Sequence, residues 1–354
     1  MFFSFSKKDN MLKKVFSVLL IGAIAFSCSN DQQSGSDKSS EKDRNSNLPY
    51  SVGASSEMLV VMNEGRWTGR AGEIVREFFH RGVPGLPQVE QQFHTANINL
   101  NKLSQKMFKK HRNLLIVDID ESYKEADISN KSDVWASPQR YIRINAPDVE
   151  SFRKIFNKHK EGLAKLYHEN EIRRVQNTFK AGEDITLRRK LMRTWNFSVV
   201  LPAGFFIAKE KDNFLWIRKE TQEYSQGLIV IMQEYEGPDQ FDKTAIINRR
   251  NKLTGKNIPG PSAGSYMKVS TAVDVLTEEV TFNGGYAVKT RGLWDVANDF
   301  MGGPFLSYTF VDEENNRLIT LDSYVYAPGQ DKRDKLLQME AVMKTFELVD
   351  EKEQ

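Results

Sequence analysis

The sequence contains a single cysteine, Cys28, among 354 residues. One thiol excludes an internal disulfide framework and any zinc site built on several cysteines. The Walker-type phosphate loop and the GxGxxG pattern are also missing, and the five histidines form no HExxH or other close ligand pair. We therefore expect no metal and no cofactor.

The N-terminal segment has the pattern of an export signal. Lys13 and Lys14 precede an apolar run of twelve residues, Val15 to Phe26. As a helix this run spans about 18 Å, whereas the hydrocarbon core of a bilayer is about 30 Å thick. Residues 1–27 are therefore expected to be a cleaved signal peptide rather than a transmembrane anchor.

The segment Ala25-Phe26-Ser27-Cys28 ends this run and resembles the lipobox of bacterial lipoproteins. The resemblance implies acylation of Cys28, with chains such as palmitate, and attachment to a membrane through it. Several acyl chains on one residue hold a protein firmly, whereas one chain binds only marginally. The pattern is the same for a start at Met1 or at Met11. A secreted protein with an incidental cysteine is the alternative.

The charge of the chain depends on this segment. The whole sequence has a formal net charge of +3 and a pI of about 8.6. Residues 1–27 hold four lysines and one aspartate, so the remaining chain has 46 basic and 46 acidic side chains. A neutral body gives no electrostatic reason to expect nucleic-acid binding.

Residues 28–47 contain no large apolar side chain after Cys28. Such a polar, serine-rich segment cannot bury surface, and we expect it to be a flexible tether. It is only mildly acidic, at Asp31 and Asp37, whereas some lipoproteins of the outer face carry a denser acidic cluster. The expected location is therefore the outer membrane, facing the periplasm, with surface exposure as the alternative.

Residues 48–195 carry the alternating strand and helix signals of a mixed α/β portion. Continuous apolar runs such as EMLVVM indicate buried strands, and Asp148 suits the start of a long amphipathic helix. The expected strands are 57–62, 92–99, 114–119 and 140–144, and the expected helices are 71–81, 100–110 and a long one over 148–180.

Residues 196–349 change in character and predict a mostly antiparallel sheet with two helices. Asn283-Gly284-Gly285 and Glu314-Asn315-Asn316 suit hairpin turns between neighbouring strands. The fold class is therefore α+β, with an order of elements somewhat like the PsbP-type fold, and residues 350–354 form a tail. The expected strands are 197–201, 205–209, 214–218, 228–234, 275–282, 286–293, 305–311 and 318–325, and the expected helices are 239–253 and 330–346.

Several phrases of the sequence recur together in one known family. They are LPYSVGASSEMLVVM (48–62), VPGLPQ (83–88), VWASPQ (134–139) and RGLWDVANDFMGGPF (291–305). Behind a lipoprotein signal, this set resembles domain of unknown function 4837, found in lipoproteins of Bacteroidota, over residues 48–349. The resemblance implies an envelope lipoprotein, and it carries no catalytic residues to transfer.

The segment 291–305 joins two predicted strands and combines large apolar, acidic and flexible residues. A tryptophan ring beside acidic and amide groups is a composition that binds sugars or peptides. The alternative is a long hairpin connection whose aromatic residues pack onto the sheet. The candidate binding residues are Arg291, Trp294, Asp295, Asn298 and Asp299.

Three weaker signals have plain structural alternatives. Residues 148–195 hold twelve basic and seven acidic side chains, which suits anionic lipid headgroups, an acidic partner or a solvated helix face. Asp118 and Asp120 share one face of a predicted strand end, as a divalent ion requires, but no calcium-binding loop follows. Ser262 is a possible nucleophile with no histidine near it in sequence.

Two functions from different classes follow from these patterns. The first is a non-catalytic envelope lipoprotein that binds an envelope protein or a glycan, and it is the one that the patterns favour. The second is a hydrolase or other enzyme that acts on envelope glycan or peptide, with carboxylates drawn from separate segments. Whether the protein is an enzyme stays open, with a binding module preferred because no catalytic signature stands out.

Overall fold

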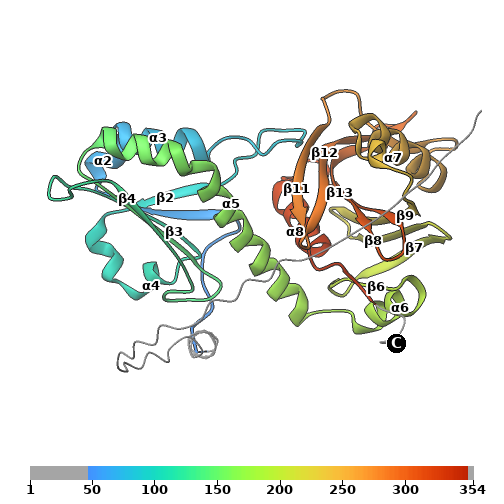
Figure 1. Ribbon diagram of the computed structural model, residues 1–354, viewed down its shortest axis with the longest axis horizontal. Helices are drawn as coiled ribbons and strands as arrows, with labels where there is room; N and C mark the ends of the chain where they lie inside the picture. Colours follow the sequence, from blue (N-terminus) through green and yellow to red (C-terminus); the bar gives the residue numbers. More distant parts are fainter. Residues whose placement is uncertain (1–46, 350–354) are drawn as a thin grey trace, which may run out of the picture. The chain divides into compact units, whose positions relative to one another are not determined.

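The computed structural model describes residues 47–349 (Figure 1). Cys28 with its predicted lipidation, the signal peptide over 1–27, the predicted tether up to Ser46 and the tail 350–354 lie outside the described residues. Among the described residues, no helix is both long enough and apolar enough to cross a membrane.

The first sheet is five-stranded and mostly parallel. The order across the sheet is β2 (His94–Ile98), β1 (Glu57–Val61), β3 (Asn113–Ile119), β5 (Arg140–Ala146) and β4 (Asp127–Ser132). Parallel pairing joins β1 to β2 and β3, and β3 to β5, while β4 pairs antiparallel with β5. The central strands β1 and β3 are largely apolar because both of their faces are covered, as in α/β proteins.

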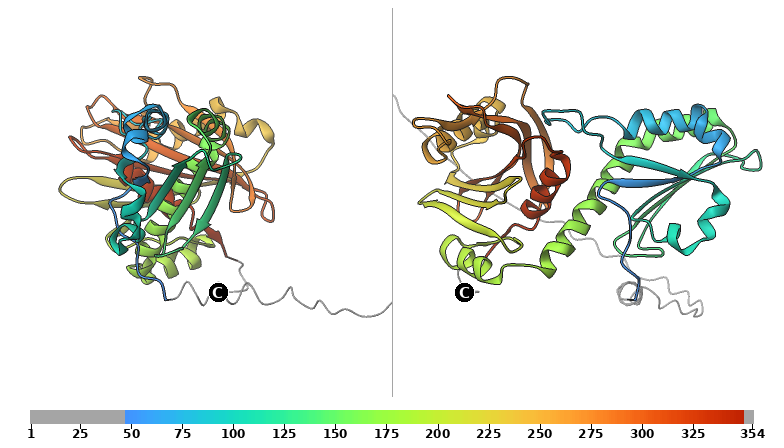
Figure 2. Two further views of the ribbon diagram at one scale, coloured as in Figure 1. Left: turned by 90° about the vertical axis from the view of Figure 1, so that its left-hand side faces the viewer. Right: turned by 180° about the vertical axis from the view of Figure 1, so that it is seen from behind.

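Alternate residues of β1 pack on opposite faces of this sheet. Met58 and Val60 belong to the cluster formed with α3 (Arg70–Phe79) and α5 (Val149–Ala181). Leu59 and Val61 face the short helices η1 (Leu100–Ser104) and α4 (Lys106–Lys109) instead. Figure 2 shows α3 and α5 side by side on one face. A further short helix, α2 (Glu64–Thr68), precedes α3.

Helix α5 confirms the predicted long helix and begins where the sequence places it. The Asp148 carboxylate accepts a hydrogen bond from the Ser151 amide at 2.7 Å, which caps the helix N-terminus. Phe152 and Phe156 pack on the first sheet. Ile172 and Val175 lie on a different face of α5 and pack against helix α8 (Arg333–Met343).

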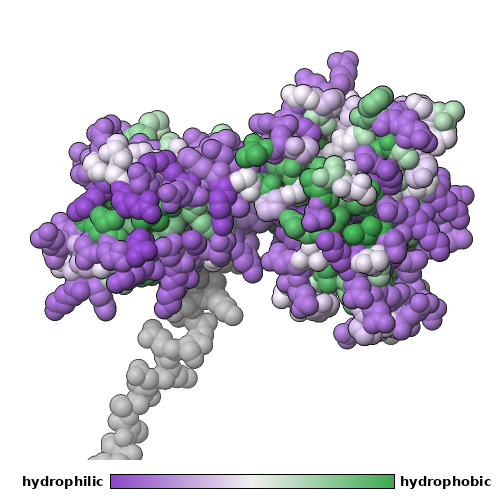
Figure 3. Space-filling view, turned by 90° about the horizontal axis from the view of Figure 1, so that it is seen from above, coloured by the Kyte–Doolittle hydropathy of each residue, from purple (hydrophilic) through white to green (hydrophobic). Residues whose placement is uncertain are grey.

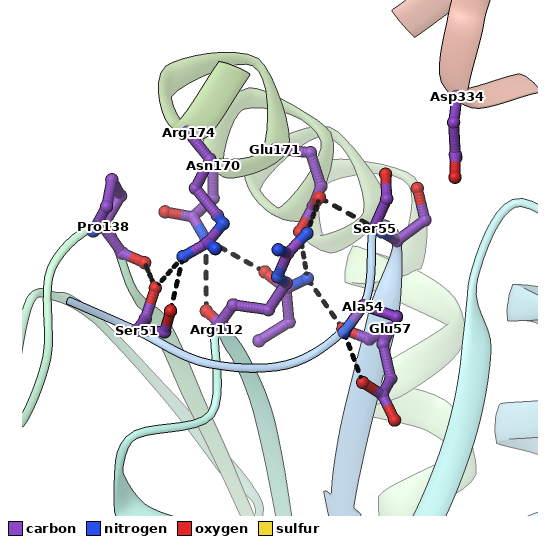
Figure 4. A network of polar contacts seen from close by, with 12 residues as sticks. Ser51, Ala54, Ser55, Glu57, Arg112, Pro138, Asn170, Glu171, Arg174 and Asp334 are labelled. Atoms are coloured by element: carbon purple, nitrogen blue, oxygen red, sulfur yellow. Dashed lines mark hydrogen bonds and ion pairs between the residues drawn. The ribbon is translucent and has the colours of Figure 1, made fainter. Parts of the chain in front are cut away.

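A buried polar network fixes α5 to the first sheet (Figure 4). The Glu171 carboxylate accepts hydrogen bonds from Arg112 at 2.6 Å, from the Asn113 amide at 2.7 Å and from the Ser56 backbone N–H at 3.1 Å. Arg174, one turn along the helix, donates to the backbone carbonyl of Ser51 at 3.0 Å. The carboxylate is buried and satisfied, so this network is structural.

The second sheet is eight-stranded and antiparallel, which confirms the α+β class. The strand β11 (Leu276–Phe282) lies beyond β10 along the same edge of β12. The order across the sheet is β10 (Tyr266–Val269), β12 (Gly285–Ala297), β13 (Gly302–Asp312), β14 (Arg317–Tyr326), β9 (Ser225–Glu234), β8 (Phe214–Glu220) and β7 (Phe205–Lys211).

Helices cover both faces of this sheet. Helix α8 and helix α6 (Ile185–Trp195) pack on one face, around Leu306 and Tyr308. Helix α7 (Lys243–Asn257), preceded by the short helix η2 (Pro238–Phe241), covers the other face, around Trp294 and Phe305. Because α6 packs on the second sheet, the C-terminal portion begins with α6 and not at the predicted residue 196.

Several elements differ from the sequence pattern. The predicted helix over 100–110 is divided at Gln105, whose backbone is extended. The strands β4, β10 and the short β15 (Glu347–Leu348) were not expected, whereas β6 (Phe197–Ser198), the partner of β15, retains the first two residues of the predicted strand 197–201. The reason is clear for β4, an edge strand whose sequence DISNKS is largely exposed and lacks alternating apolar residues.

Candidate functional site: an aromatic groove at the hairpin ends of the second sheet

Two tight turns bring aromatic residues to one end of the second sheet. Asn283 and Gly284, which link β11 to β12, have φ angles of 49° and 87°. Asn316, in the turn from β13 to β14, has a φ of 51°. Asparagine and glycine tolerate this left-handed backbone, which matches the twist of a tight hairpin. The turns therefore place Phe282, Tyr286 and Phe310 at the same end of the sheet.

A groove of about 950 Å³ lies at this end. Its size falls within the range of ligand-binding pockets in proteins. The lining comes from η2, both hairpin turns and the segment after α8. Its aromatic side chains are Tyr235, Phe241, Phe282, Tyr286, Phe310 and Phe346.

Three of these rings form the open wall of the groove. Phe241 meets Tyr286 edge to face with ring centroids 5.3 Å apart, and Tyr235 lies 6.2 Å from Phe241. Tyr286 is 51% exposed. Partial burial and the nearby Glu279 carboxylate raise the pKa of Tyr286, so its hydroxyl stays protonated at neutral pH and can donate a hydrogen bond.

The inner wall is a second row of rings that belongs to the core. Phe282 and Phe346 are buried, and each packs against Phe310, at 5.1 Å and 5.8 Å between ring centroids. The Asn283 amide donates to the backbone carbonyl of Phe346 at 2.5 Å, which ties the β11–β12 turn to the segment after α8. A buried inner wall thus faces a partly exposed outer wall.

Hydrophobic side chains gather on the C-terminal half of the face shown in Figure 3, more than on the N-terminal half. The exposed large apolar residues of that half include Tyr266, Leu276, Tyr286, Phe300 and Leu348. Of these, Tyr286 and Leu348 line the groove. Single exposed apolar residues are common, whereas an aromatic-lined hollow is a feature of binding sites.

The segment 291–305 has a different structure from the predicted connection. Strand β12 continues to Ala297 and β13 begins at Gly302, so only residues 298–301 form the turn. Trp294 is 2% exposed, donates from its indole nitrogen to the carbonyl of Val325 at 3.3 Å and packs against Tyr324. The geometry of Trp294 supports the packing alternative.

The other four candidate residues point in different directions. Asp295 lies 3.6 Å from the Lys268 ammonium, and Arg291 faces Glu340 from the side of α8. Asn298 adopts the left-handed backbone of the turn. Asp299 accepts a hydrogen bond from the Ser262 hydroxyl at 2.5 Å. The structure therefore does not bring the five side chains into one site.

Ser262 lies in the loop between α7 and β10 rather than at a strand-to-helix turn. The segment Gly260 to Gly264 fits the spacing of a nucleophile elbow, which needs that turn to present the serine. Its hydroxyl donates to Asp299 and not to a histidine. The loop therefore lacks the geometry of a serine hydrolase.

Asp118 and His168 have structural partners. Asp118 accepts hydrogen bonds from Arg143 at 2.7 Å and from the Tyr123 hydroxyl at 2.8 Å. Within residues 47–349, no cluster of three or more histidine, cysteine, aspartate or glutamate side chains is arranged to hold a metal ion. His168 contacts Glu340 at 3.0 Å.

Glu340, on α8, is the centre of a buried charge cluster. Lys289 and the Tyr308 hydroxyl lie 2.6 Å and 2.7 Å from one carboxylate oxygen, and His168 and Arg291 face the other. Burial alone raises the pKa of Glu340, but the cations outweigh it and hold that pKa well below its usual range. Burial lowers the pKa of Lys289 and raises that of Tyr308. The cluster joins α5, α8 and the second sheet.

The chain is similar to several solved structures in part of its fold. Ran-binding protein Mog1p of Saccharomyces cerevisiae is 13% identical, with 44% of this chain and 91% of that chain covered and a TM-score of 0.29. Cyanobacterial PsbP from Synechocystis sp. PCC 6803 is 15% identical, with 43% and 86% covered and a TM-score of 0.27. LpqN, involved in cell envelope biogenesis of Mycobacterium tuberculosis, is 12% identical, with 44% and 83% covered and a TM-score of 0.26. These likenesses carry no function to this chain.

Two family models divide the described chain. Residues 51–180 match a domain of unknown function, DUF8532, and residues 184–345 match DUF4837. The phrases at 83–88 and 134–139 therefore belong to the DUF8532 range, and the DUF4837 match is shorter than the 48–349 that the resemblance implies. No curated protein matches the chain. The chain thus carries, over residues 184–345, the DUF4837 domain that its sequence resembles, preceded by a DUF8532 domain.

Proposed function

We propose that this protein is a lipid-anchored envelope protein that binds a ligand, without catalysis, in the aromatic groove. The observation that carries the proposal is the open wall of three contacting rings, Tyr235, Phe241 and Tyr286, over a hollow of about 950 Å³. Tyr286 is half-exposed and the other two rings are partly exposed. Keeping such aromatic surface in water costs free energy that a ligand recovers when it covers the rings.

The sequence supports the anchor. The apolar run up to Phe26 is followed directly by the small residue Ser27 and the lipobox cysteine, Cys28. A polar segment then precedes the first described residue, Asn47. We place the protein at the outer membrane, facing the periplasm, because the segment after Cys28 is only mildly acidic. The candidate ligands are then an envelope protein or a glycan.

The lining of the groove supports binding over catalysis. Within the described part of the chain, none of the residues that line it is a histidine, a cysteine or a serine. The groups at its rim are Asn283, Asn316, Lys344 and the carboxylates Glu313 and Glu347. Amide and charged groups beside aromatic rings orient a ligand and give specificity.

An alternative function rests on those two carboxylates. Glu313 and Glu347 come from separate segments and line the same groove, as a hydrolase that uses two carboxyl groups requires. The variants Glu313→Gln and Glu347→Gln separate the two functions. If the wild type hydrolyses an envelope polymer and these variants lose that hydrolysis while they still bind, the protein is an enzyme. If the wild type hydrolyses no envelope polymer, the binding function holds.

The binding proposal is tested by what co-purifies with the acylated protein from crosslinked envelopes. We expect one reproducible species with the wild type and its loss in the double variant Phe241→Ala, Tyr286→Ala. Phe300→Ala is the matched control, because Phe300 is also exposed but lies in the turn at the opposite end of β12. Equal recovery from both variants contradicts the proposal. The anchor is tested separately, by the mass of the N-terminal peptide and by release of Cys28→Ser from the membrane fraction.

A further inference from the structure

A second hollow, of about 500 Å³, lies next to the aromatic groove. Asn316 lines both hollows. Its left-handed backbone, with a φ of 51°, holds it at the turn between β13 and β14. Asn316 therefore lies on the border between the two hollows, and its amide donates to the backbone carbonyl of Tyr235 at 3.4 Å.

The two hollows differ in chemistry. The groove is aromatic, whereas the residues that line the second hollow include Thr194, Asn196, Gln233, Asn315 and Asn316. The Asn315 amide donates to Asp312, the Asn316 amide to the Tyr235 carbonyl and the Thr194 hydroxyl to the Lys190 carbonyl. The side chains of Gln233 and Asn315 are at least partly exposed. Each amide can both donate and accept hydrogen bonds. A ligand that spans the border thus meets aromatic surfaces on one side and residues with amide groups, such as Gln233, on the other.

The charged residues that line the two hollows restrict the class of ligand further. The groove has Glu313 and Glu347 against the single cation Lys344. In the second hollow, Asp212 and Glu234 are acidic. The cation Arg317 also lines this hollow, but the Asp312 carboxylate, 2.7 Å from its guanidinium, neutralises its charge. An excess of carboxylates disfavours phosphate, anionic phospholipid and acidic sugars by like-charge repulsion.

The position of the hollows also bears on the ligand. Extended peptides commonly bind by adding a strand to an open sheet edge. Both hollows lie instead at the hairpin ends, where the Asn283 and Asn316 turns close the strand ladders. Side-chain rings and amides, rather than backbone groups of an edge, are what this end of the sheet offers.

We propose that the two hollows form one extended site for a neutral oligosaccharide, which lies across Asn316. The CH groups on the face of a sugar ring carry partial positive charge and pack on the negative faces of aromatic rings such as Tyr286 and Phe241. Sugar hydroxyls exchange hydrogen bonds with the amides of the second hollow. This inference rests on the proposed function and names the ligand of the same groove.

The test uses the full-length acylated protein in detergent and the uncharged probes maltohexaose, cellohexaose and chitohexaose, each compared with its disaccharide. Trp195 lines the second hollow and is one of five tryptophans, so the part of the fluorescence change that is lost in Trp195→Phe reports occupancy there. We expect at least one hexasaccharide to bind with a Kd below about 1 mM and the disaccharide about tenfold more weakly, since it reaches one hollow only.

Two single variants locate the sugar. Tyr286→Ala in the groove and Gln233→Ala in the second hollow are each expected to weaken hexasaccharide binding about tenfold, whereas Phe300→Ala leaves it unchanged. Binding that neither variant weakens overturns the inference, as does the absence of binding by all three probes.

The outcome for the inference is separable from that for the proposed function. A protein that crosslinks to the groove, with none of the neutral sugars bound, sustains the binding module and overturns the oligosaccharide. If no crosslinked species is lost when the groove residues are replaced, and no sugar binds, both proposals fail. Sugar binding that depends on Tyr286 and Gln233 sustains both.

Discussion

Phe241 and Tyr286 meet edge to face, with ring centroids 5.3 Å apart, at the open wall of the groove. Phe241 ends the short helix η2, and Tyr286 follows the turn that begins β12. Neither segment contains a local sequence pattern that predicts this contact. The pair exists because the antiparallel sheet brings the start of β12 and the segment after β9 to the same end, and both rings retain partly exposed surface there.

Replacement of Tyr286 should separate binding from folding. Because the side chain is half-exposed, we expect Tyr286→Ala to lower the free energy of unfolding by about 1 kcal/mol or less. Ligand capture should fall about tenfold. Chemical denaturation and quantitative capture on the same preparation measure both. A large loss of stability would assign Tyr286 to the core instead.

Replacement of Trp294 should do the opposite. Its ring is buried against Tyr324 under α7, and removing a large buried aromatic side chain costs about 3 to 5 kcal/mol. We expect Trp294→Ala to unfold at a lower denaturant concentration while the folded fraction keeps its ligand affinity. A selective loss of affinity with unchanged stability would restore the binding role that the sequence suggests for Trp294.

The charge cluster around Glu340 should be a major source of stability. Glu340→Gln leaves Lys289 and Arg291 without a buried counter-ion, and breaking such a cluster from one side costs about 3 to 5 kcal/mol. The control is Glu161→Gln, which removes an exposed carboxylate on α5 that pairs with Arg81. Its effect on the unfolding midpoint should be much smaller. Similar effects of both variants would contradict a special role for Glu340.

The same cluster predicts the sign of an acid effect. The pKa of Glu340 is held well below its usual range in the folded protein. Its contribution is therefore fully present above the unfolded pKa, near 4.5, and is lost as the pH falls through the folded pKa. Between pH 5 and about pH 3 the wild type should lose stability more steeply than Glu340→Gln. Parallel stability curves for the two proteins would refute this linkage.

Glu90 should act as a cap for a helix far away in sequence. Its carboxylate accepts hydrogen bonds from the backbone N–H groups of Lys332 and Arg333, at 2.8 Å and 2.7 Å, at the start of α8. We expect Glu90→Ala to cost about 1 to 2 kcal/mol and to speed amide exchange in the first turn of α8. Val89→Ala, the exposed neighbour, is the control. Unchanged exchange in α8 would exclude the capping role.

Much of the fold could be predicted from local patterns. The run Met58 to Val61 is apolar throughout because both faces of β1 are covered, and the spacing of Phe152 and Phe156 marks the buried stripe of α5. Asn283 and Gly284 mark the β11–β12 hairpin because its turn needs a left-handed backbone. Each of these signals lies within a single element.

The site could not be predicted in the same way. Tyr235, Phe241 and Tyr286 come from three segments, and only the sheet order brings them together. The composition of 291–305 points to Trp294, but this residue lies on the face of β12 that α7 covers, so its ring is buried. The sequence feature that could have indicated the groove is the position of aromatic residues next to turns, as at Phe282 and Tyr286.

Site-specific photocrosslinking in intact cells tests the central claim most directly. A photoreactive benzoylphenylalanine is placed at position 286, in the groove, or at position 300, in the exposed turn at the far end of β12. If the groove is the binding site of an anchored envelope protein, position 286 captures one discrete species in the membrane fraction and position 300 does not. If both positions capture the same mixture of abundant envelope components, or neither captures anything, the groove is not the binding site.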